Sequence, residues 1–114
     1  MATLSTHVLD TSRGRPAGGI EISLERLNAG EGWSPLSQGV TDDDGRVKQF
    51  VLTDQNLGAG TYRLVFSVEK YFEQLQQKSF YPEVSVTFMI ETGAEHYHVP
   101  LLISPFGYST YRGS

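Results

Sequence analysis

"EHYHVPLLISPFGYSTYR", residues 95–112, contains two segments whose side chains suit an extended backbone, separated by a turn. Successive side chains of an extended segment point to opposite faces. Pro105 and Gly107 in "SPFG" are typical turn residues. The stretch therefore predicts two antiparallel strands joined by a tight turn, with His96 and His98 on one face.

The same period of two recurs through most of the chain. Turn signals separate these segments at "RGRPAGG", "NAGEG", "DDDG" and "NLGAG", at a spacing typical of an antiparallel sandwich. The alternating segments are residues 6–12, 19–27, 61–69 and 83–91.

One segment departs from this pattern. "VEKYFEQLQQKSFYP", residues 68–82, is rich in Glu, Gln, Leu and Lys and has Phe72 and Leu75 at near-helical spacing. We expect a short helix at about residues 70–78. The fold class is therefore all-β, a sandwich of seven or eight strands with one short helix.

Length and composition predict one domain spanning residues 1–114. The net charge is -4 and the basic residues are scattered, which argues against nucleic acid as a partner. The absence of cysteine excludes disulfides, a thiolate nucleophile and sulfur-ligated zinc. With no targeting segment or membrane-spanning run, we expect a cytoplasmic protein that does not enter a membrane.

The two neighbouring histidines admit two interpretations. His96 and His98 could form a metal-binding pair or a general base with a helper. They could equally be polar side chains on a solvated sheet face, and spacing alone favours this second interpretation because no third ligand lies nearby in the sequence. No metal site is predicted.

The acidic turn "DDDGR", residues 42–46, does not fit an EF-hand, because valines would occupy the first and twelfth ligand positions. It predicts a turn with Gly45 at positive φ that starts a strand at Arg46 or Val47. The ending Tyr111 to Ser114 offers a phenol, a hydroxyl and an α-carboxylate, or else is a frayed terminus.

Four stretches in sequence order resemble the 5-hydroxyisourate hydrolases, the transthyretin-like or transthyretin-related proteins. The resemblance covers practically the whole chain, and the terminal "YRGS" is the feature that separates these hydrolases from the transthyretin carrier. The stretches are "STHVLDTSRGRPA" (5–17), "DDDGR" (42–46), "SFYPEVSVTF" (79–88) and "HYHVPLLISPFGYSTYRGS" (96–114).

The resemblance implies an eight-stranded transthyretin-like (prealbumin-like) sandwich with one short helix, assembled as a homotetramer of two dimers that pair sheet edges. It places the active sites between the dimers. The implied reaction belongs to urate (purine) catabolism and needs no metal or organic cofactor. Water opens the six-membered ring of 5-hydroxyisourate to yield 2-oxo-4-hydroxy-4-carboxy-5-ureidoimidazoline.

The family's functional residues are all matched here. The catalytic set is His7, Arg46 and His98, and His7 and Arg46 also bind substrate together with Tyr111, Arg112, Gly113 and Ser114. Either His98 or His7 would be the general base, and Arg46 would stabilise the charge that develops on the substrate. His96 would pack or hydrogen-bond beside the site.

Two other classes of function compete with this one. A transthyretin-like carrier would hold an aromatic ligand in the channel between dimers, since fold alone does not determine function. An adhesion or structural β-sandwich would be a monomer. Histidine and arginine in the channel favour a small polar heterocycle over a large apolar hormone.

Overall fold

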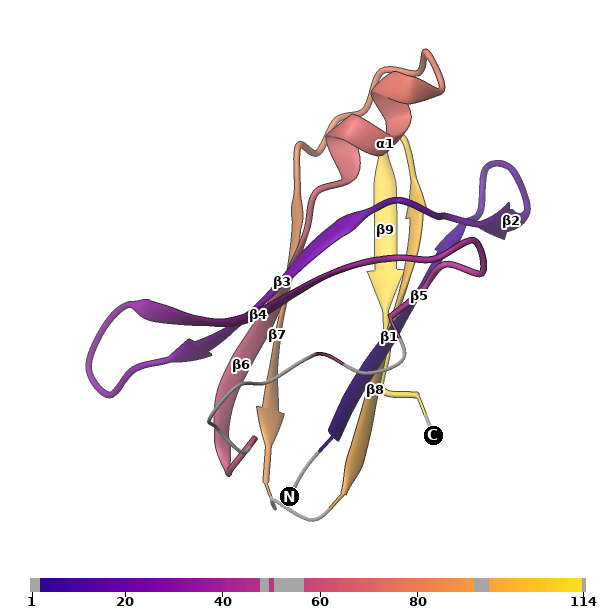
Figure 1. The fold of residues 1–114 in the computed structure, drawn as a ribbon. Helices are drawn as coiled ribbons and strands as arrows, with labels where there is room; N and C mark the ends of the chain where they lie inside the picture. The colour runs from indigo at the N-terminus through magenta and orange to yellow at the C-terminus, as the bar shows by residue number, and fades with distance from the viewer. Residues whose placement is uncertain (1–2, 48–49, 51–56, 92–94, 114) are drawn as a thin grey trace.

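Two β-sheets pack face to face (Figure 1). The computed structural model describes residues 3–47, 50, 57–91 and 95–113. The first sheet consists of β1 (Thr3–Asp10), β2 (Arg15–Pro16), β5 (Arg46–Val47), β8 (His96–Ser104) and β9 (Gly107–Thr110). The second has the order β4-β3-β6-β7 and consists of β3 (Glu21–Leu27), β4 (Trp33–Val40), β6 (Gly60–Phe66) and β7 (Val84–Ile90).

The predicted all-β sandwich with one short helix is confirmed. Nine strands are found in the described part of the chain, against the predicted seven or eight, and two of them, β2 and β5, are only two residues long. The predicted hairpin is β8 and β9, which pair antiparallel from Leu101–Thr110 to Ser104–Gly107. Within the described residues, no helix has the length and apolarity that crossing a membrane requires.

The core lies between the sheets and follows the period of two. In β1 the residues at even positions are buried, and in β8 Tyr97, Val99, Leu101 and Ile103 are buried. Burying a large apolar side chain contributes about 1.5–3 kcal/mol. The intervening residues of both strands therefore face outward, and this face carries the polar side chains of interest.

The central pairing of the first sheet is parallel. Strands β1 and β8 run side by side in one register from Thr3↔His96 to Asp10↔Ile103. The paired residues of β1 and β8 lie at the spacing at which neighbouring strands form backbone hydrogen bonds. The two ends of the sequence are thereby adjacent over eight residue pairs.

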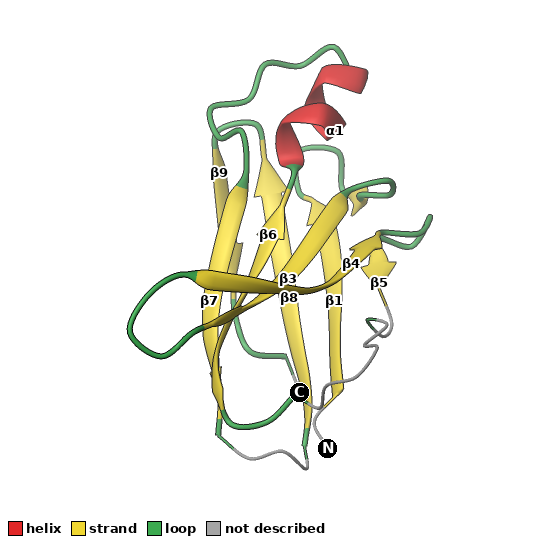
Figure 2. Ribbon diagram, turned by 60° about the vertical axis from the view of Figure 1, so that its left-hand side comes forward, coloured by secondary structure: helices red, strands yellow, loops and turns green. Residues whose placement is uncertain are grey.

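The helix α1 (Val68–Gln74) covers one end of the sandwich (Figure 2). It starts two residues before the predicted position and ends four residues earlier. Gln76 has a left-handed backbone with φ of 59°, and the N–H groups of Leu75 and Gln77 donate to the carbonyl of Phe72. This turn ends the helix before the polar run that follows.

Strand β4 is not predicted by the alternation of the sequence. It is an edge strand, and Pro35 within it has no N–H to donate. Its register with β3 shifts between Leu24 and Glu25, which breaks the alternation. Its residues are exposed or half-buried throughout, so no clear apolar face marks it.

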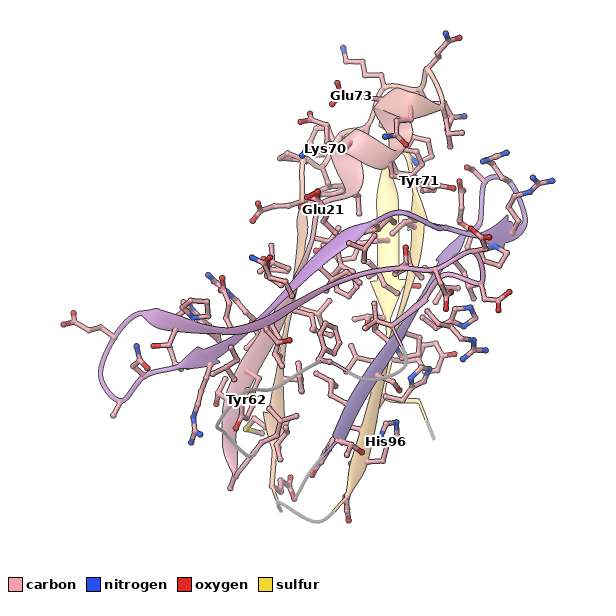
Figure 3. The ribbon with its side chains drawn as sticks, in the orientation of Figure 1. Glu21, Tyr62, Lys70, Tyr71, Glu73 and His96 are labelled. Carbon is pink, nitrogen blue, oxygen red and sulfur yellow. The ribbon has the colours of Figure 1, made fainter. Side chains whose placement is uncertain are left out.

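A buried carboxylate connects the helix to the first sheet. Asp10, at the end of β1, is fully buried and accepts hydrogen bonds from the Ser12 hydroxyl at 2.6 Å and the Ser12 amide at 3.0 Å. The hydroxyl of Tyr71 in α1 donates to its other oxygen at 2.8 Å. Tyr71 lies between α1 and the sheets (Figure 3). Burial and the neighbouring Asp10 raise the pKa of the Tyr71 phenol, so it remains a donor at neutral pH.

Replacing Tyr71 with phenylalanine should lower the free energy of unfolding by about 1–3 kcal/mol, because a buried carboxylate oxygen loses its donor. Urea unfolding followed by Trp33 fluorescence measures the change. The control is Tyr108→Phe, whose ring is exposed and which should shift stability by less than about 0.5 kcal/mol. Equal effects of the two substitutions would contradict this role for Tyr71.

Candidate functional site

The outward face of the first sheet collects the residues that the sequence singled out. His7 of β1 lies directly opposite Arg46 of β5. On the other side of β1, Ser5 lies opposite His98 of β8. Side chains two residues apart on a strand share a face, so the structure brings His7, Arg46 and His98 together on one face.

The acidic turn positions Arg46. Gly45 has φ of 76°, and an added Cβ would lie 2.3 Å from the carbonyl oxygen of Val8, so only glycine fits there. The carboxylate of Asp42 accepts hydrogen bonds from the amides of Asp44 at 2.9 Å and Arg46 at 3.0 Å. The predicted positive φ of Gly45 is confirmed, and the strand begins at Arg46, the first of the two predicted positions. The turn thereby places Arg46 at the edge of β1.

The hydrogen bond of His7 determines its tautomer. Its Nε2 lies 2.8 Å from the carbonyl oxygen of Asp44. A carbonyl oxygen only accepts, so His7 donates from Nε2. In the neutral ring, Nδ1 therefore carries the lone pair.

His98 shares a hydroxyl with its neighbour on the same strand. The Oγ atom of Ser5 is 2.8 Å from His98 Nδ1 and 2.9 Å from His96 Nε2. The other ring nitrogen of His96 is hydrogen-bonded to the hydroxyl of Thr3. Figure 3 labels His96 on β8, beside β1. His96 thus hydrogen-bonds beside the predicted site.

The surroundings of His98 oppose its protonation. Partial burial is the largest cause that lowers its pKa, followed by the guanidinium of Arg46 and by the neighbouring imidazoles of His7 and His96. A hydrogen bond with the Ser5 backbone acts in the opposite direction. The net pKa lies below 6.5, so His98 is neutral at pH 7 and can accept a proton.

The C-terminal segment packs against His98. The amide of Gly113 donates to the carbonyl of His98 at 2.9 Å, which forms an isolated antiparallel bridge. A Cβ on Gly113 would lie 2.5 Å from Cδ2 of the His98 ring. Glycine is therefore the residue that lets the chain end approach this imidazole closely.

The other predicted substrate-binding residues are Tyr111, Arg112 and Ser114. Arg112 forms an ion pair with Glu95 at 3.1 Å, and its guanidinium lies 4.7 Å from the centroid of the Tyr97 ring. Tyr111 is exposed. Ser114 lies outside the described residues.

A cavity of about 340 Å³ lies beside the C-terminal segment. It is lined by residues of β7, β8 and the C-terminal segment, including Phe88, His98, Tyr111 and Arg112.

Among the described residues, no group of three or more His, Asp or Glu side chains is arranged to hold a metal ion.

Sequence reasoning missed three partners of the histidines, Thr3, Ser5 and Asp44. Ser5 shares the outward face of β1 with His7, but its contact with His98 depends on the register of β1 with β8, which no local pattern in the sequence reveals. Asp44 acts through its backbone carbonyl, so its side chain carries no signal of this role.

Replacing Arg46 with glutamine should raise the pKa of His98, because the cation that opposes the imidazolium is removed. An NMR titration of the His98 Cε1–H signal measures the change. Arg15→Gln, on the exposed β2, should leave this pKa unchanged. A downward shift in Arg46→Gln would contradict the electrostatic account.

The chain is similar to known proteins along nearly its whole length. The model of the HIUase/Transthyretin family matches residues 4–113. A probable 5-hydroxyisourate hydrolase of Caenorhabditis elegans is 50% identical over 113 residues, which cover 99% of this chain and 82% of that protein.

Solved structures show the same fold. The 5-hydroxyisourate hydrolase of Klebsiella pneumoniae is 41% identical with a TM-score of 0.82, and the match covers 98% of this chain and 99% of that one. Sea bream transthyretin in complex with thyroxine is 32% identical with a TM-score of 0.89, over 96% and 93% of the two chains. By its sequence along nearly its whole length and by its fold, the chain belongs to the HIUase/Transthyretin family.

Proposed function

We propose that the protein is a 5-hydroxyisourate hydrolase that opens the six-membered ring of its substrate in urate catabolism, yielding 2-oxo-4-hydroxy-4-carboxy-5-ureidoimidazoline. The observation that carries this proposal is the neutral His98 grouped with His7 and Arg46 on one sheet face. The names of its relatives from Caenorhabditis elegans and Klebsiella pneumoniae support the same activity.

His98 is the better candidate for the general base. Its lowered pKa keeps the ring neutral, so a nitrogen lone pair is available to take a proton from water. That water adds to the acyl carbon of the C–N bond that breaks. His7, whose Nε2 is engaged by the Asp44 carbonyl, presents Nδ1 and would orient the water or act on the departing nitrogen.

Arg46 supplies the electrostatic part of the mechanism. As the ring opens, negative charge develops on the carbonyl oxygens of the substrate. The planar guanidinium carries a fork of N–H donors that fits such oxygens. Its position across from His7 supports contact with the same substrate that the histidines would activate.

The C-terminal segment would close the pocket. Tyr111 and Arg112 line the cavity that also includes His98. We propose that Tyr111 to Ser114 hydrogen-bond the edges of the substrate, with Gly113 allowing the segment to lie against the His98 ring.

We also propose a homotetramer in which two dimers, formed by paired sheet edges, enclose the sites. Strands β7 and β9 stand at the ends of their sheets, where a second copy could extend each sheet. The prediction of a cytoplasmic enzyme without metal or cofactor stays a prediction.

A carrier function is the second candidate, because sea bream transthyretin has this fold and its structure contains thyroxine. The grouping of two histidines and an arginine favours a small polar substrate instead. Calorimetry with thyroxine separates the two functions, since tight binding without hydrolysis would reverse their order.

The protein should accelerate the ultraviolet decay of 5-hydroxyisourate generated with a urate oxidase. His98→Ala and Arg46→Ala should each reduce the rate by about 10²- to 10⁴-fold, the typical value of a positioned acid–base or electrostatic group. Light scattering after size exclusion must show that both variants remain tetramers. An unchanged decay rate with the wild-type protein would refute the hydrolase.

Gly113→Ala should lower activity at least about tenfold while the sandwich stays folded, because the methyl group would push the His98 ring from its place. The matched control is Gly107→Ala, whose Cβ would make only an ordinary 3.6 Å contact with the Ser104 hydroxyl. Circular dichroism checks folding. Equal activities of the two variants would show that the approach of Gly113 to His98 has no catalytic value.

A further inference from the structure

Four side chains form a hydrogen-bonded chain along the outward face of β1 and β8. The hydroxyl of Thr3 bonds Nδ1 of His96. Nε2 of His96 lies 2.9 Å from Ser5 Oγ, which lies 2.8 Å from Nδ1 of His98. The chain alternates hydroxyl, imidazole, hydroxyl, imidazole.

The parallel register builds this chain. Thr3 lies opposite His96, and Ser5 lies opposite His98, so each histidine of β8 has a hydroxyl residue of β1 beside it. All four residues occupy the outward positions of their strands. His96 is exposed to solvent and His98 is half-buried, so the chain runs from solvent toward the site.

The shared hydroxyl of Ser5 links the positions of the protons on the His96 and His98 rings. Ser5 has one hydroxyl proton and can give it to only one of the two imidazoles. If it donates to His98 Nδ1, His98 carries its own proton on Nε2, and His96 must donate from Nε2 to Ser5. If it donates to His96 Nε2, both neutral rings carry their proton on Nδ1.

We propose that Ser5 and His96 are positioning residues for His98, and that the Ser5 hydroxyl locks the two imidazoles into matching tautomers and relays protons between them. This inference rests on the proposed hydrolase function. It adds to that function a route by which a proton taken up by His98 leaves the site.

The proposed reaction starts with both imidazole rings protonated on Nδ1. His98 Nε2 takes a proton from the water whose oxygen bonds the acyl carbon. The Nδ1 proton of His98 passes to Ser5, and Ser5 gives its own proton to His96 Nε2. His96 then releases its Nδ1 proton to solvent by way of Thr3.

Both rings now carry the proton on Nε2. His98 gives its Nε2 proton to the departing ring nitrogen as the C–N bond breaks. The reverse shift restores Nδ1–H on His98 through Ser5, while His96 takes one proton back from solvent. One proton leaves and one returns, so no net charge remains on the protein.

The groups around His98 explain why a proton should leave this ring. Arg46 and His7 disfavour a positive charge on His98. Because the proton can leave through Ser5, His98 need not hold an imidazolium beside that arginine. The exposed His96 is the member of the chain that water can reach.

Long-range ¹⁵N–¹H NMR of the imidazole rings tests the coupling without any substrate, at a pH where both rings are neutral. In the wild-type protein, His96 and His98 should carry their protons on the same nitrogen. Ser5→Ala should change the tautomer populations of at least one ring, and Ser5→Thr should restore the wild-type pattern because it keeps the hydroxyl. Opposite tautomers in the wild type, or unchanged tautomers in Ser5→Ala, would overturn the proposal.

Kinetics test the relay. Ser5→Ala and His96→Phe should each lower kcat by about 10- to 100-fold with little change in KM, the size of effect that an orienting partner of a functional imidazole has at metal sites. Ser5→Thr should recover most of the loss. The control Ser85→Ala, an exposed serine of β7, should keep wild-type kinetics.

The outcomes separate the two proposals. An inactive wild-type protein with matched tautomers would refute the hydrolase while leaving the coupling established. An active enzyme in which Ser5→Ala keeps its full kcat would overturn the relay and leave the hydrolase standing. A loss of kcat in Ser5→Ala that Ser5→Thr fails to recover would also overturn it, since the hydroxyl would then not be the cause.

Discussion

The parallel pairing of β1 with β8 is the constraint on which the rest of the site depends. It sets Ser5 beside His98 and leaves the opposite edge of β1 for β5, which places Arg46 across from His7. A shift of one residue in this register would turn every side chain of a strand to the other face. The buried residues of both strands oppose such a shift, because it would bring polar groups into the core. The packing of the core thereby fixes the register of the two strands, and with it the positions of the outward polar side chains.

The site combines cationic side chains with an uncharged base. In the proposed reaction Arg46 would stabilise negative charge on the substrate, and it also disfavours a proton on His98. One charge would therefore serve two steps of the proposed reaction, since it keeps the lone pair of His98 available and would attract the oxygens of the substrate. The backbone holds these groups through the Gly45 turn and the Gly113 bridge, where a side chain would collide with its surroundings. Such preorganisation reduces the rearrangement that the reaction needs.

Much of the fold and part of the site could be predicted from the sequence. Alternation identifies β3, β6, β7 and the β8–β9 hairpin, because each strand has one clear apolar face. Strand β4 lacks such a face and escaped prediction. The grouping of His7, Arg46 and His98 came from the family resemblance and not from spacing, because these residues lie far apart in the sequence. The role of Ser5 depends on the β1–β8 register, and the role of Asp44 on a backbone atom, so neither has a local signal.

The hydrogen bond between Ser5 and His98 joins residues 93 positions apart, so the two strands that carry the histidines come from opposite ends of the chain. Bringing such distant residues together costs loop-closure entropy, which grows slowly with the length of the loop. No partial structure that lacks either terminal strand contains this pair of groups. The proposed chemistry would therefore need both strands in place, and local opening of β1 and β8 at the end where Thr3 pairs with His96 would separate Ser5 from His98 even where the rest of the sandwich stays intact.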